Sequence, residues 1–496
     1  MRAPSLYAFA LLFLLAGCAG PDLGQFEGQT DVGVVRHAGS VDYDAATGAY
    51  TVVGGGDNMW EDKDDFHYIW KRVPTRDLAL SADIELLGAT GNPHRKAILM
   101  IRQDLDRDAA YVSAAVHGNG ISALQHREIK GGITYEIISN VRQARRLALT
   151  REGDVAYMSV AAGADPLQPS GGSYKVAFGD SVYVGIGVSA HDNDTTQTAV
   201  FTDVRLDTNL PAASGEPVVE STLEIIPVAA YTDRRVVWRA MERFEAPNWS
   251  PDGSYLLFNM NGGLYTIPPA GGEPKMIETD PVIRANNDHG ITFDGKTLII
   301  SGVGPGHTAS RVYTAPIAGG KARQITPLEP SYWHGVSPDG KTLVYVGQRN
   351  GDYDIYAMPI GGGRERRLTT AVGLDDGPEY SPDGQWIYFN SVRTGTMQIY
   401  RMRPDGSGQE QLTFDEYNDW FPHISPDGQH MVFVSFEPGV EGHPPYHDVM
   451  LRMMPAEGGA VRTVAKLFGG QGTINVNSWS PDSKEFAFVS HRLARP

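Results

Sequence analysis

The chain has 496 residues, of which 41% are apolar, so its length and composition allow two to four domains with sizeable cores. Its net charge is −17 and like charges form no block. This argues against nucleic acid as a partner, because binding phosphate requires surfaces rich in Lys and Arg.

Residues 1–18 have the pattern of a targeting segment. Arg2 precedes the apolar run LYAFALLFLLAG (6–17), which is too short to span a bilayer and leads directly into Cys18. The segment resembles a bacterial lipoprotein signal peptide, which implies cleavage before Cys18 and lipidation of that residue. An ordinary signal peptide with a chance cysteine is the alternative. Ala19 follows the cysteine, so the resemblance implies an outer-membrane anchor, on the periplasmic side or at the cell surface.

After a short tether, residues 19–30, the chain is a succession of short strand-like runs as far as residue 210. These runs are rich in β-branched and small residues, and Gly, Asn and Asp turn signals separate them. They are KAILMIRQDL (96–105), AYVSAAVHG (110–118), ISALQHREI (121–129), VAYMSVAAG (155–163) and SVYVGIGVSAH (181–191). The pattern predicts an all-β sandwich over residues 31–210.

The strand with Arg102-Gln103 and the strand from Tyr111 to Gly118 resemble strands of concanavalin-like jelly rolls, which occur in bacterial surface and glycan-handling proteins. The resemblance implies a jelly-roll fold for this region. Its polar segments WEDKDDFHYIWKR (60–72) and GNPHRK (91–96) either bind glycan or pack on the next domain. An unpatterned stretch rich in Pro, Ser and Gly then predicts a linker at residues 211–222.

From residue 223 the chain repeats a turn. The turns begin at Ser250, Thr292, Ser337, Ser381, Ser425 and Ser480, which are 42, 45, 44, 44 and 55 residues apart. Five of them are followed by a second repeated unit: GGLYTIPPAGG, SRVYTAPIAGG, YDIYAMPIGGG, MQIYRMRPDGSG and DVMLRMMPAEGG. Each copy reads as four short strands joined by turns, the unit of a propeller blade. Six copies predict a six-bladed β-propeller over residues 223–496.

The two ends of the repeat region complement each other. Only one strand-like run follows the last turn, whereas two precede the first, LEIIPVAAY (223–231) and RRVVWRAM (234–241). We expect these terminal strands to pair and close the ring, because an open edge exposes unpaired backbone groups. The predicted fold class is therefore all-β, a jelly-roll β-sandwich followed by a six-bladed β-propeller closed by N- and C-terminal strands.

The SPDG…IY…GG…LT repeat resembles the TolB-type propeller, which also occurs in prolyl peptidases and oligogalacturonate lyases. The repeat is specific for the architecture and leaves the function open, because one propeller fold hosts many activities. The helical N-terminal domain of TolB has no counterpart in this sequence, so a Tol-system transport role is not implied. A G-x-S-x-G elbow is also missing from the sequence, which argues against peptidase activity of the prolyl type.

Residues just ahead of each turn are predicted to gather at one mouth of the central channel, because the first strand of every blade lines that channel. This position is polar in blade after blade, and loops on a rigid scaffold commonly carry binding sites. The predicted ligand-binding residues are Asn287, Asp288, Tyr332, Trp333, Arg349, Glu379, Asp419, Trp420, Gln471 and Asn475.

Three chemistries fit such a mouth. Aromatic side chains can stack on sugars while Asp, Asn, Arg and His bind hydroxyls. Imidazoles and carboxylates also suit a divalent metal such as Mn²⁺, Zn²⁺ or Ca²⁺, and the candidate ligands are His289, His334, His423 and His443. A His or Tyr base beside a charge-stabilising Arg or metal could abstract a proton α to a uronate carboxylate, and paired carboxylates could hydrolyse a glycosidic bond. The candidate catalytic residues are His289, His334, Asp376 and His423.

The sequence thus favours a lipid-anchored envelope lipoprotein whose propeller mouth binds carbohydrate or another small polar ligand, as a TolB-like binding or assembly protein. The alternative is a glycan-active enzyme, a metal-dependent polysaccharide lyase or hydrolase. The histidine-rich, metal-binding mouths of oligogalacturonate lyases are similar in general placement, but those propellers have seven blades, so their catalytic roles cannot be transferred residue by residue.

Overall fold

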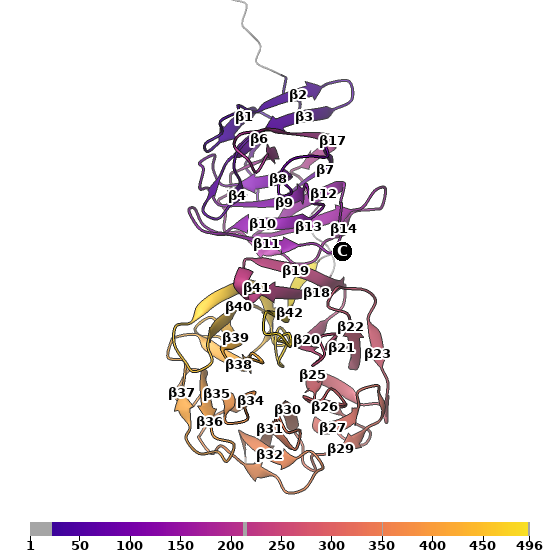
Figure 1. Cartoon of the computed structure of the whole chain (residues 1–496), viewed down its shortest axis with the longest axis vertical. Coiled ribbons are helices and arrows are strands. Elements are labelled where there is room, and N and C mark those ends of the chain that lie inside the picture. Colours follow the sequence, from indigo (N-terminus) through magenta and orange to yellow (C-terminus); the bar gives the residue numbers. More distant parts are fainter. Residues whose placement is uncertain (1–21, 212–215, 350, 495–496) are drawn as a thin grey trace, which may run out of the picture.

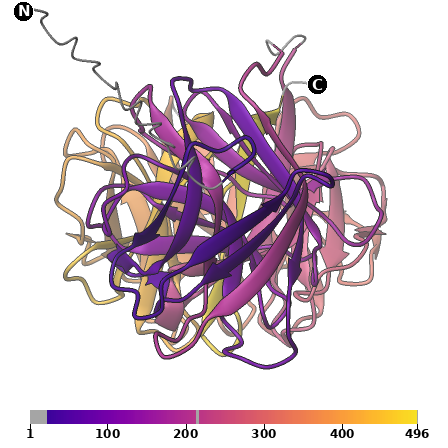
Figure 2. The same cartoon turned by 90° about the horizontal axis from the view of Figure 1, so that it is seen from above.

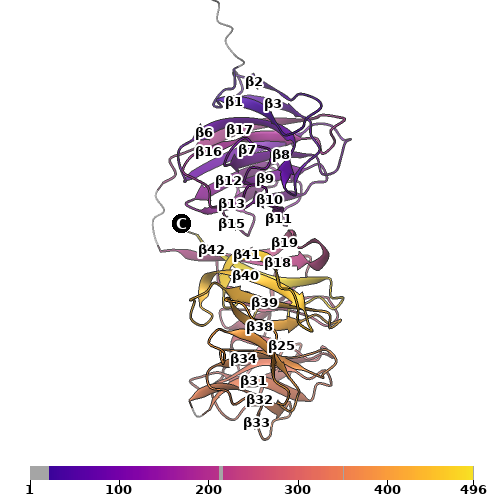
Figure 3. The ribbon, with the colours of Figure 1, turned by 90° about the vertical axis from the view of Figure 1, so that its left-hand side faces the viewer.

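The computed structural model describes residues 22–211, 216–349 and 351–494. They form a two-sheet sandwich and a propeller, which follow one another along the long axis of the molecule (Figures 1 and 3). Seen along that axis, the sandwich overlies the ring of blades (Figure 2). The all-β prediction is confirmed for this part of the chain, where the one helical segment is the 3₁₀ turn η1 (Val228–Ala230). The predicted signal peptide and Cys18 lie outside the described residues.

The sandwich consists of two sheets. One is formed, in spatial order, by β1 (Gly28–Val32), β6 (Phe66–Val73), β16 (Val182–Ser189), β8 (Lys96–Arg102), β9 (Tyr111–His117), β10 (Ser122–Arg127) and β11 (Thr134–Ile138). The other contains β14 (Gln168–Pro169), β13 (Val155–Ala161), β12 (Arg146–Glu152), β7 (Leu78–Leu86), β17 (Gln197–Asp207), β3 (Ala49–Gly54) and β2 (Ser40–Asp44), with β15 (Tyr174–Lys175) beside β13. A small hairpin, β4 (Met59–Trp60) and β5 (Lys63–Asp64), lies outside both sheets.

A single apolar core fills the space between the sheets. Alternate residues of β7 are buried, as expected of a strand with one face inward. Leu80 and Phe201 from one sheet pack in the same cluster as Leu99 and Ile186 from the other. Phe26 belongs to this core and β1 begins at Gly28, so the sandwich starts inside the range predicted as a tether. No helix among the described residues is long and apolar enough to cross a membrane.

A buried ion-pair network anchors the polar segment at residues 60–72. The Asp64 carboxylate accepts hydrogen bonds from Arg127 Nη2 at 2.8 Å and Nη1 at 2.9 Å, and lies 3.3 Å from Arg102 Nη1. All three side chains are fully buried. Burying charge requires such pairing, so these residues hold the sandwich together and are not available to a ligand.

The propeller contains five four-stranded blades, arranged around the centre in Figure 1. The first two are β20 (Phe244–Trp249), β21 (Leu256–Met260), β22 (Gly263–Ile267) and β23 (Lys275–Ile277), then β25 (Arg284–Ile291), β26 (Thr297–Val303), β27 (Arg311–Pro316) and β29 (Arg323–Gln324). Between them, β24 (Thr279–Asp280) pairs with β28 (Gly320–Lys321).

The other three blades continue the ring in chain order. They are β30 (Ser331–Val336), β31 (Thr342–Arg349), β32 (Asp352–Pro359) and β33 (Arg366–Arg367); β34 (Asp375–Tyr380), β35 (Ile387–Ser391), β36 (Gln398–Met402) and β37 (Glu410–Gln411); and β38 (Asn418–Ile424), β39 (His430–Phe436), β40 (Pro445–Pro455) and β41 (Arg462–Gly470). The first strand of each blade is innermost, as the repeat predicts.

The repeated turn is stabilised in the same way in every copy. In the first, Ser250 Oγ donates to Asp252 Oδ1 at 2.8 Å and accepts a hydrogen bond from the Tyr255 amide at 3.0 Å. The same hydroxyl-to-Asp contact recurs at the five later turns, at 2.6–2.7 Å. A short polar side chain at the turn thus satisfies backbone groups between the first and second strands, which explains why the motif repeats.

The prediction of six four-stranded blades is wrong in its count. In the sixth copy, residues 471–478 form an irregular segment in place of an inner strand, and Trp479 makes only an isolated bridge to Phe486. Glycines at positive φ, Gly470 at 102° and Gly472 at 98°, accompany this irregularity. The copy therefore contributes one regular strand, β42 (Glu485–Ala494).

The terminal strands pair as predicted, but they also join the sandwich. Strand β42 pairs with β18 (Val218–Pro227), which pairs with β19 (Asp233–Ala240). Because β42 contacts both β20 and β41, these strands complete the ring between the first and fifth blades. Strand β19 then runs parallel to β11, so one ten-stranded sheet extends through both parts. Strand β18 begins at Val218, within the range predicted as a linker, 211–222.

Candidate functional site at the propeller mouth

A cavity of about 840 Å³ opens at the end of the channel where the loops enter the inner strands. One position of the repeat, five residues before the turn Ser or Thr, contributes to its wall in five of the six copies. These residues are Glu245, Asn287, Tyr332, Asp376 and Asn475. The predicted gathering of pre-turn side chains at one mouth is thus found at this position.

A bulge in each inner strand explains why this position faces the cavity. The pairing register between the first and second strands shifts in all five blades, for example between Asp376 and Glu379. Gly377 at φ 60° and Phe421 at φ 56° lie within two of these bulges. A bulge bends the strand and redirects its side chains, so the residues ahead of it are turned toward the mouth.

The centre of the cavity wall is a histidine between two carboxylates. His334 Nε2 lies 3.3 Å from Asp376 Oδ1 and 3.8 Å from Asp288 Oδ1, and all three side chains are buried. Burial alone would lower the pKa of His334, but the charges of Asp288 and Asp376 outweigh it and raise the value. Burial would likewise raise the pKa of Asp376, but its contact with His334 lowers it overall.

The two carboxyls beside His334 therefore differ in acidity. Burial raises the pKa of Asp288 to about 6, and the attraction of His334 only partly offsets this. The Asp288 and Asp376 oxygens nearest to His334 Nε2 are at most about 7 Å apart, because they lie 3.8 and 3.3 Å from that one atom. Two carboxyls of unlike acidity thus flank one imidazole, and Asp288 keeps its proton to a higher pH than Asp376 does.

A second charged group lies on the wall formed by the first blade. Glu245 is paired with Arg243, and Asn259 Nδ2 lies 3.4 Å from Glu245 Oε2. Burial raises the pKa of Glu245 despite the Arg243 charge. The mouth therefore combines three carboxyls with arginine, histidine and amide groups, a mixture that offers both hydrogen-bond donors and acceptors.

Replacing Asp288 by Asn is expected to raise the free energy of unfolding at pH 7.5 by about 1–2 kcal/mol. A carboxyl whose pKa is higher in the folded state destabilises the protein as pH rises from about 4 through about 6. The advantage of the variant should therefore disappear near pH 4, as urea unfolding at both pH values would reveal. The matched variant Asp352→Asn removes a carboxyl outside the cavity wall and serves as the reference for the comparison. A pH-independent difference for Asp288→Asn would contradict this explanation.

The structure brings together about half of the predicted site residues. Those on the cavity wall are Asn287, Asp288, Tyr332, His334, Asp376, His443, Gln471 and Asn475. Those away from the wall are His289, Trp333, Arg349, Glu379, Asp419, Trp420 and His423.

The residues away from the wall have structural contacts. His423 Nδ1 lies 2.7 Å from Glu379 Oε2, and its Nε2 lies 2.9 Å from the Ile474 carbonyl oxygen. Asp419 is buried against Arg452, at 3.1 Å, and accepts a hydrogen bond from Ser435. These groups therefore stabilise the blades and do not contact the cavity.

The predicted tryptophan platforms are parts of the core. Trp333 and Trp420 are buried in two separate apolar clusters between blades. The Trp333 ring leaves no room for a side chain at Gly290 of the neighbouring blade, since a Cβ there would lie 2.3 Å from it. Arg349 instead pairs with Glu365, at 3.1 Å. The aromatic residues on the cavity wall are Tyr332, Tyr353 and Phe421.

The four histidines predicted as metal ligands do not fit a common metal site. Among the described residues, no group of three or more His, Cys, Asp or Glu side chains is arranged to hold a metal ion. Both ring nitrogens of His423 are engaged by Glu379 and Ile474, and His289 is buried away from the wall. Two of the four predicted ligands are therefore unavailable to a metal ion at the mouth.

Several wall residues were not among the predicted ones. They are Arg243, Glu245, Asn259, Asn261, Arg284, Asn286, Tyr353 and Phe421. Glu245 occupies, in the first copy, the same position of the repeat as Asp376. Asn259 and Tyr353 lie on or beside second and third strands, where the pre-turn pattern has no signal.

Comparison with known proteins agrees with the propeller type that the repeat indicates. The family model of the TolB β-propeller domain matches residues 330–443. An uncharacterized protein of Agrobacterium fabrum is 50% identical over 288 residues, which are 58% of this chain and 97% of that relative. The solved structure of a putative TolB from Agrobacterium tumefaciens is 49% identical, with a TM-score of 0.54, and covers 56% of this chain and all of its own.

This chain belongs to the TolB-like β-propeller family. The Agrobacterium fabrum relative is matched over nearly its whole length, so it has no counterpart for the remaining 42% of the TolB-like chain described here. A structure of oligogalacturonate lyase in complex with manganese is 13% identical, has a TM-score of 0.33 and covers 52% of this chain and 72% of its own. This distant likeness to the lyase propellers concerns the fold alone.

Proposed function

We propose that this TolB-like chain is a binding or assembly protein of the bacterial cell envelope whose propeller mouth binds a carbohydrate. The observation that carries the proposal is the cavity whose wall takes one polar side chain from the same position of five repeat copies. Its volume, about 840 Å³, suits one to three sugar rings.

The chemistry of the wall supports a polyhydroxyl ligand. Asn287, Asn475 and Gln471 carry amides that can donate and accept at the same time, as sugar hydroxyls require. The Asp376 carboxylate can accept hydrogen bonds from two adjacent hydroxyls. Tyr332 is half-buried on the wall, where its ring can contact the apolar face of a sugar.

The envelope location rests on the sequence. The LAGC pattern supports lipidation at Cys18 and an outer-membrane anchor, and the family supports a place in the envelope. We further infer that the N-terminal sandwich is a concanavalin-like jelly roll. Mass spectrometry of the protein purified from membranes would test the anchor, since an unmodified Cys18 would contradict it.

Glycan binding should depend on the mouth. Calorimetric titration of the purified chain with neutral and uronic oligosaccharides is expected to find at least one ligand. Asp376→Asn should weaken its binding about tenfold or more, because a hydrogen bond to a charged group contributes roughly 1.5–3 kcal/mol. The control variant Asp352→Asn, which lies outside the wall, should bind as the wild type does. Equal affinity of the two variants, or no binding by the wild type, would reject the proposal.

A second candidate function, glycoside hydrolysis, is favoured by the unlike carboxyls at His334. Asp288, whose pKa is raised to about 6, could protonate a leaving oxygen, while Asp376 is held ionised and could activate water. The same oligosaccharides incubated with the protein would then yield new reducing ends. If they are bound but returned intact, the protein is a binding protein only.

A further inference from the structure

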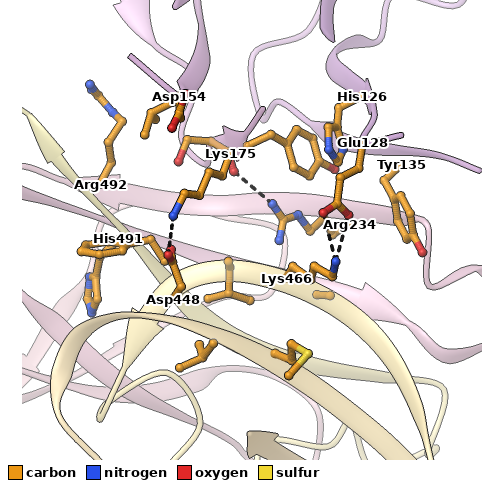
Figure 4. Close-up of a pocket in the computed structure, with 18 of the residues that line it drawn as sticks. His126, Glu128, Tyr135, Asp154, Lys175, Arg234, Asp448, Lys466, His491 and Arg492 are labelled. Carbon is orange, nitrogen blue, oxygen red and sulfur yellow. Dashed lines mark hydrogen bonds and ion pairs between the residues drawn. The ribbon is translucent and has the colours of Figure 1, made fainter. Parts of the chain in front are cut away.

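A second cavity, of about 720 Å³, lies where the sandwich meets the propeller. Its walls come from β10–β13 and β15 of the sandwich and the loops beside them, from β40 and β41 of the fifth blade, and from β19 and β42 of the shared sheet (Figure 4). Among the described residues, no side chain lines both this cavity and the mouth. The two cavities are therefore separate candidate sites.

Polar side chains on the cavity wall lack hydrogen-bond partners. Neither ring nitrogen of His126 has one, nor does the Tyr174 hydroxyl, and both residues are more than nine-tenths buried. The His126 ring stacks on Tyr174 with centroids 4.0 Å apart, and Arg234 Cζ lies 4.9 Å from the same Tyr174 ring. Leaving buried polar groups unpaired costs free energy, so their presence on a cavity wall points to a hydrogen-bonding occupant.

The side chains of His126 and Tyr174 are neutral. Burial, followed by the Arg234 and Lys466 charges, lowers the pKa of His126 to about 3, so its ring offers one donor and one acceptor at neutral pH. Burial also raises the pKa of Tyr174, which keeps its hydroxyl protonated. The wall thus presents a donor, an acceptor and a hydroxyl within one stack of rings.

Each cation on this wall lies within ion-pair distance of a carboxylate, although Nε and Nη1 of Arg234 have no hydrogen-bond partner. Lys175 Nζ lies 2.6 Å from Asp448 and Lys466 Nζ lies 3.0 Å from Glu128, so both pairs connect the sandwich to the propeller (Figure 4). The other two pairs are Arg234 with Glu224 and Arg492 with Glu220. A charged ligand would have to compete with these partners, whereas an uncharged one would not.

The propeller contributes an apolar part of the wall. Met450, Val464 and Leu467 of β40 and β41 line the cavity below the sandwich residues. The cavity therefore suits a molecule with an apolar face and a hydrogen-bonding edge. A sugar ring has both, because its C–H groups and its hydroxyls lie on different sides.

We propose that the junction of sandwich and propeller is a second ligand site that takes an uncharged saccharide of one or two rings. Its hydroxyls bind His126 and Tyr174 while its C–H face contacts the β40–β41 side. This site does not depend on the function proposed for the mouth. It joins two parts that share a continuous sheet, so its occupant contacts both at once.

The test uses the full chain with ¹³C-labelled histidine and two named probes, N-acetylglucosamine and cellobiose. Either probe at concentrations up to about 10 mM is expected to shift the His126 ring resonance in two-dimensional NMR. His126→Phe keeps a ring on Tyr174 but removes both nitrogens, and should weaken binding about tenfold. Because it also removes two unpaired polar atoms, it should raise Tm slightly, so a loss of binding cannot be attributed to unfolding.

Three controls make the result specific. Tyr174→Phe, which removes only the hydroxyl, should also weaken binding, whereas Asp376→Asn at the mouth should leave it unchanged. Glucuronate and glucosamine should bind less well than the neutral probes. The proposal is overturned if neither neutral probe shifts His126, which would indicate a cavity filled by water only. Unchanged affinity of both junction variants, or equal binding of the charged sugars, would also overturn it.

Discussion

Replacing Asp64 by alanine is expected to lower the free energy of unfolding by about 3–5 kcal/mol, because it leaves two buried guanidinium groups without a counter-charge. Arg127 loses hydrogen bonds of 2.8 and 2.9 Å, and Arg102 loses a carboxylate 3.3 Å away. Both arginines also lie over buried rings, Arg127 over Tyr111 and Arg102 over Phe66, so neither can swing out to solvent.

Urea unfolding followed by far-UV circular dichroism would measure this effect. The matched control is Asp62→Ala, two residues away, whose side chain is exposed and should change stability by less than about 0.5 kcal/mol. Similar midpoints for the two variants would mean that the buried network contributes little. The comparison also tests the interpretation of residues 60–72, since a glycan-binding role for Asp64 predicts loss of binding without loss of stability.

Truncating Glu379 to alanine should cost about 3 kcal/mol of stability, although it lies outside the cavity wall, because two buried donors and the His423 ring lose their hydrogen-bond partner. Its Oε1 accepts from the Ile424 amide at 2.9 Å and from Asn477 Nδ2 at 2.6 Å, and its Oε2 lies 2.7 Å from His423 Nδ1. These bonds connect the fourth and fifth blades to the irregular sixth copy, where a regular inner strand is missing.

Glu379→Gln is the conservative control. Its oxygen can still accept from Ile424 and Asn477, while its amide donates to His423 Nδ1 and the ring donates from Nε2 to the Ile474 carbonyl. We therefore expect a loss of less than about 1 kcal/mol in thermal unfolding. If glutamine is as disruptive as alanine, the charge of Glu379 matters more than its hydrogen bonds. If neither variant is destabilised, this network does not hold the ring closed.

The position of the candidate site could be predicted from the sequence, but only some of the residues that line it could. Asn287, Asp288 and Asp376 were identified because the repeat places the same position of each blade at one opening. Trp420 has the same spacing from its turn, yet its indole is buried in the core between blades. Spacing fixes where the backbone passes, whereas the direction of each side chain depends on the bulge and on what the neighbouring blade leaves unfilled.

The histidines illustrate the same limit. His334 and His443 line the mouth, whereas His423 is engaged by Glu379 from the adjacent blade, a contact between residues 44 positions apart. The sequence shows only that a position is histidine, and it does so equally for a side chain that binds a ligand and for one that pairs with a buried carboxylate. Only the partners at each ring nitrogen distinguish the two roles.

By itself, the sequence determined the all-β class, the propeller repeat, the pairing of its terminal strands and the mouth at which polar side chains collect, because turn chemistry and strand periodicity are local properties. The tertiary structure alone decided the five regular blades, the sheet shared between sandwich and propeller, and the second cavity at their junction. Those features depend on contacts between residues such as Glu136 and Asp233, or Lys175 and Asp448, which lie far apart in the chain and leave no pattern in it.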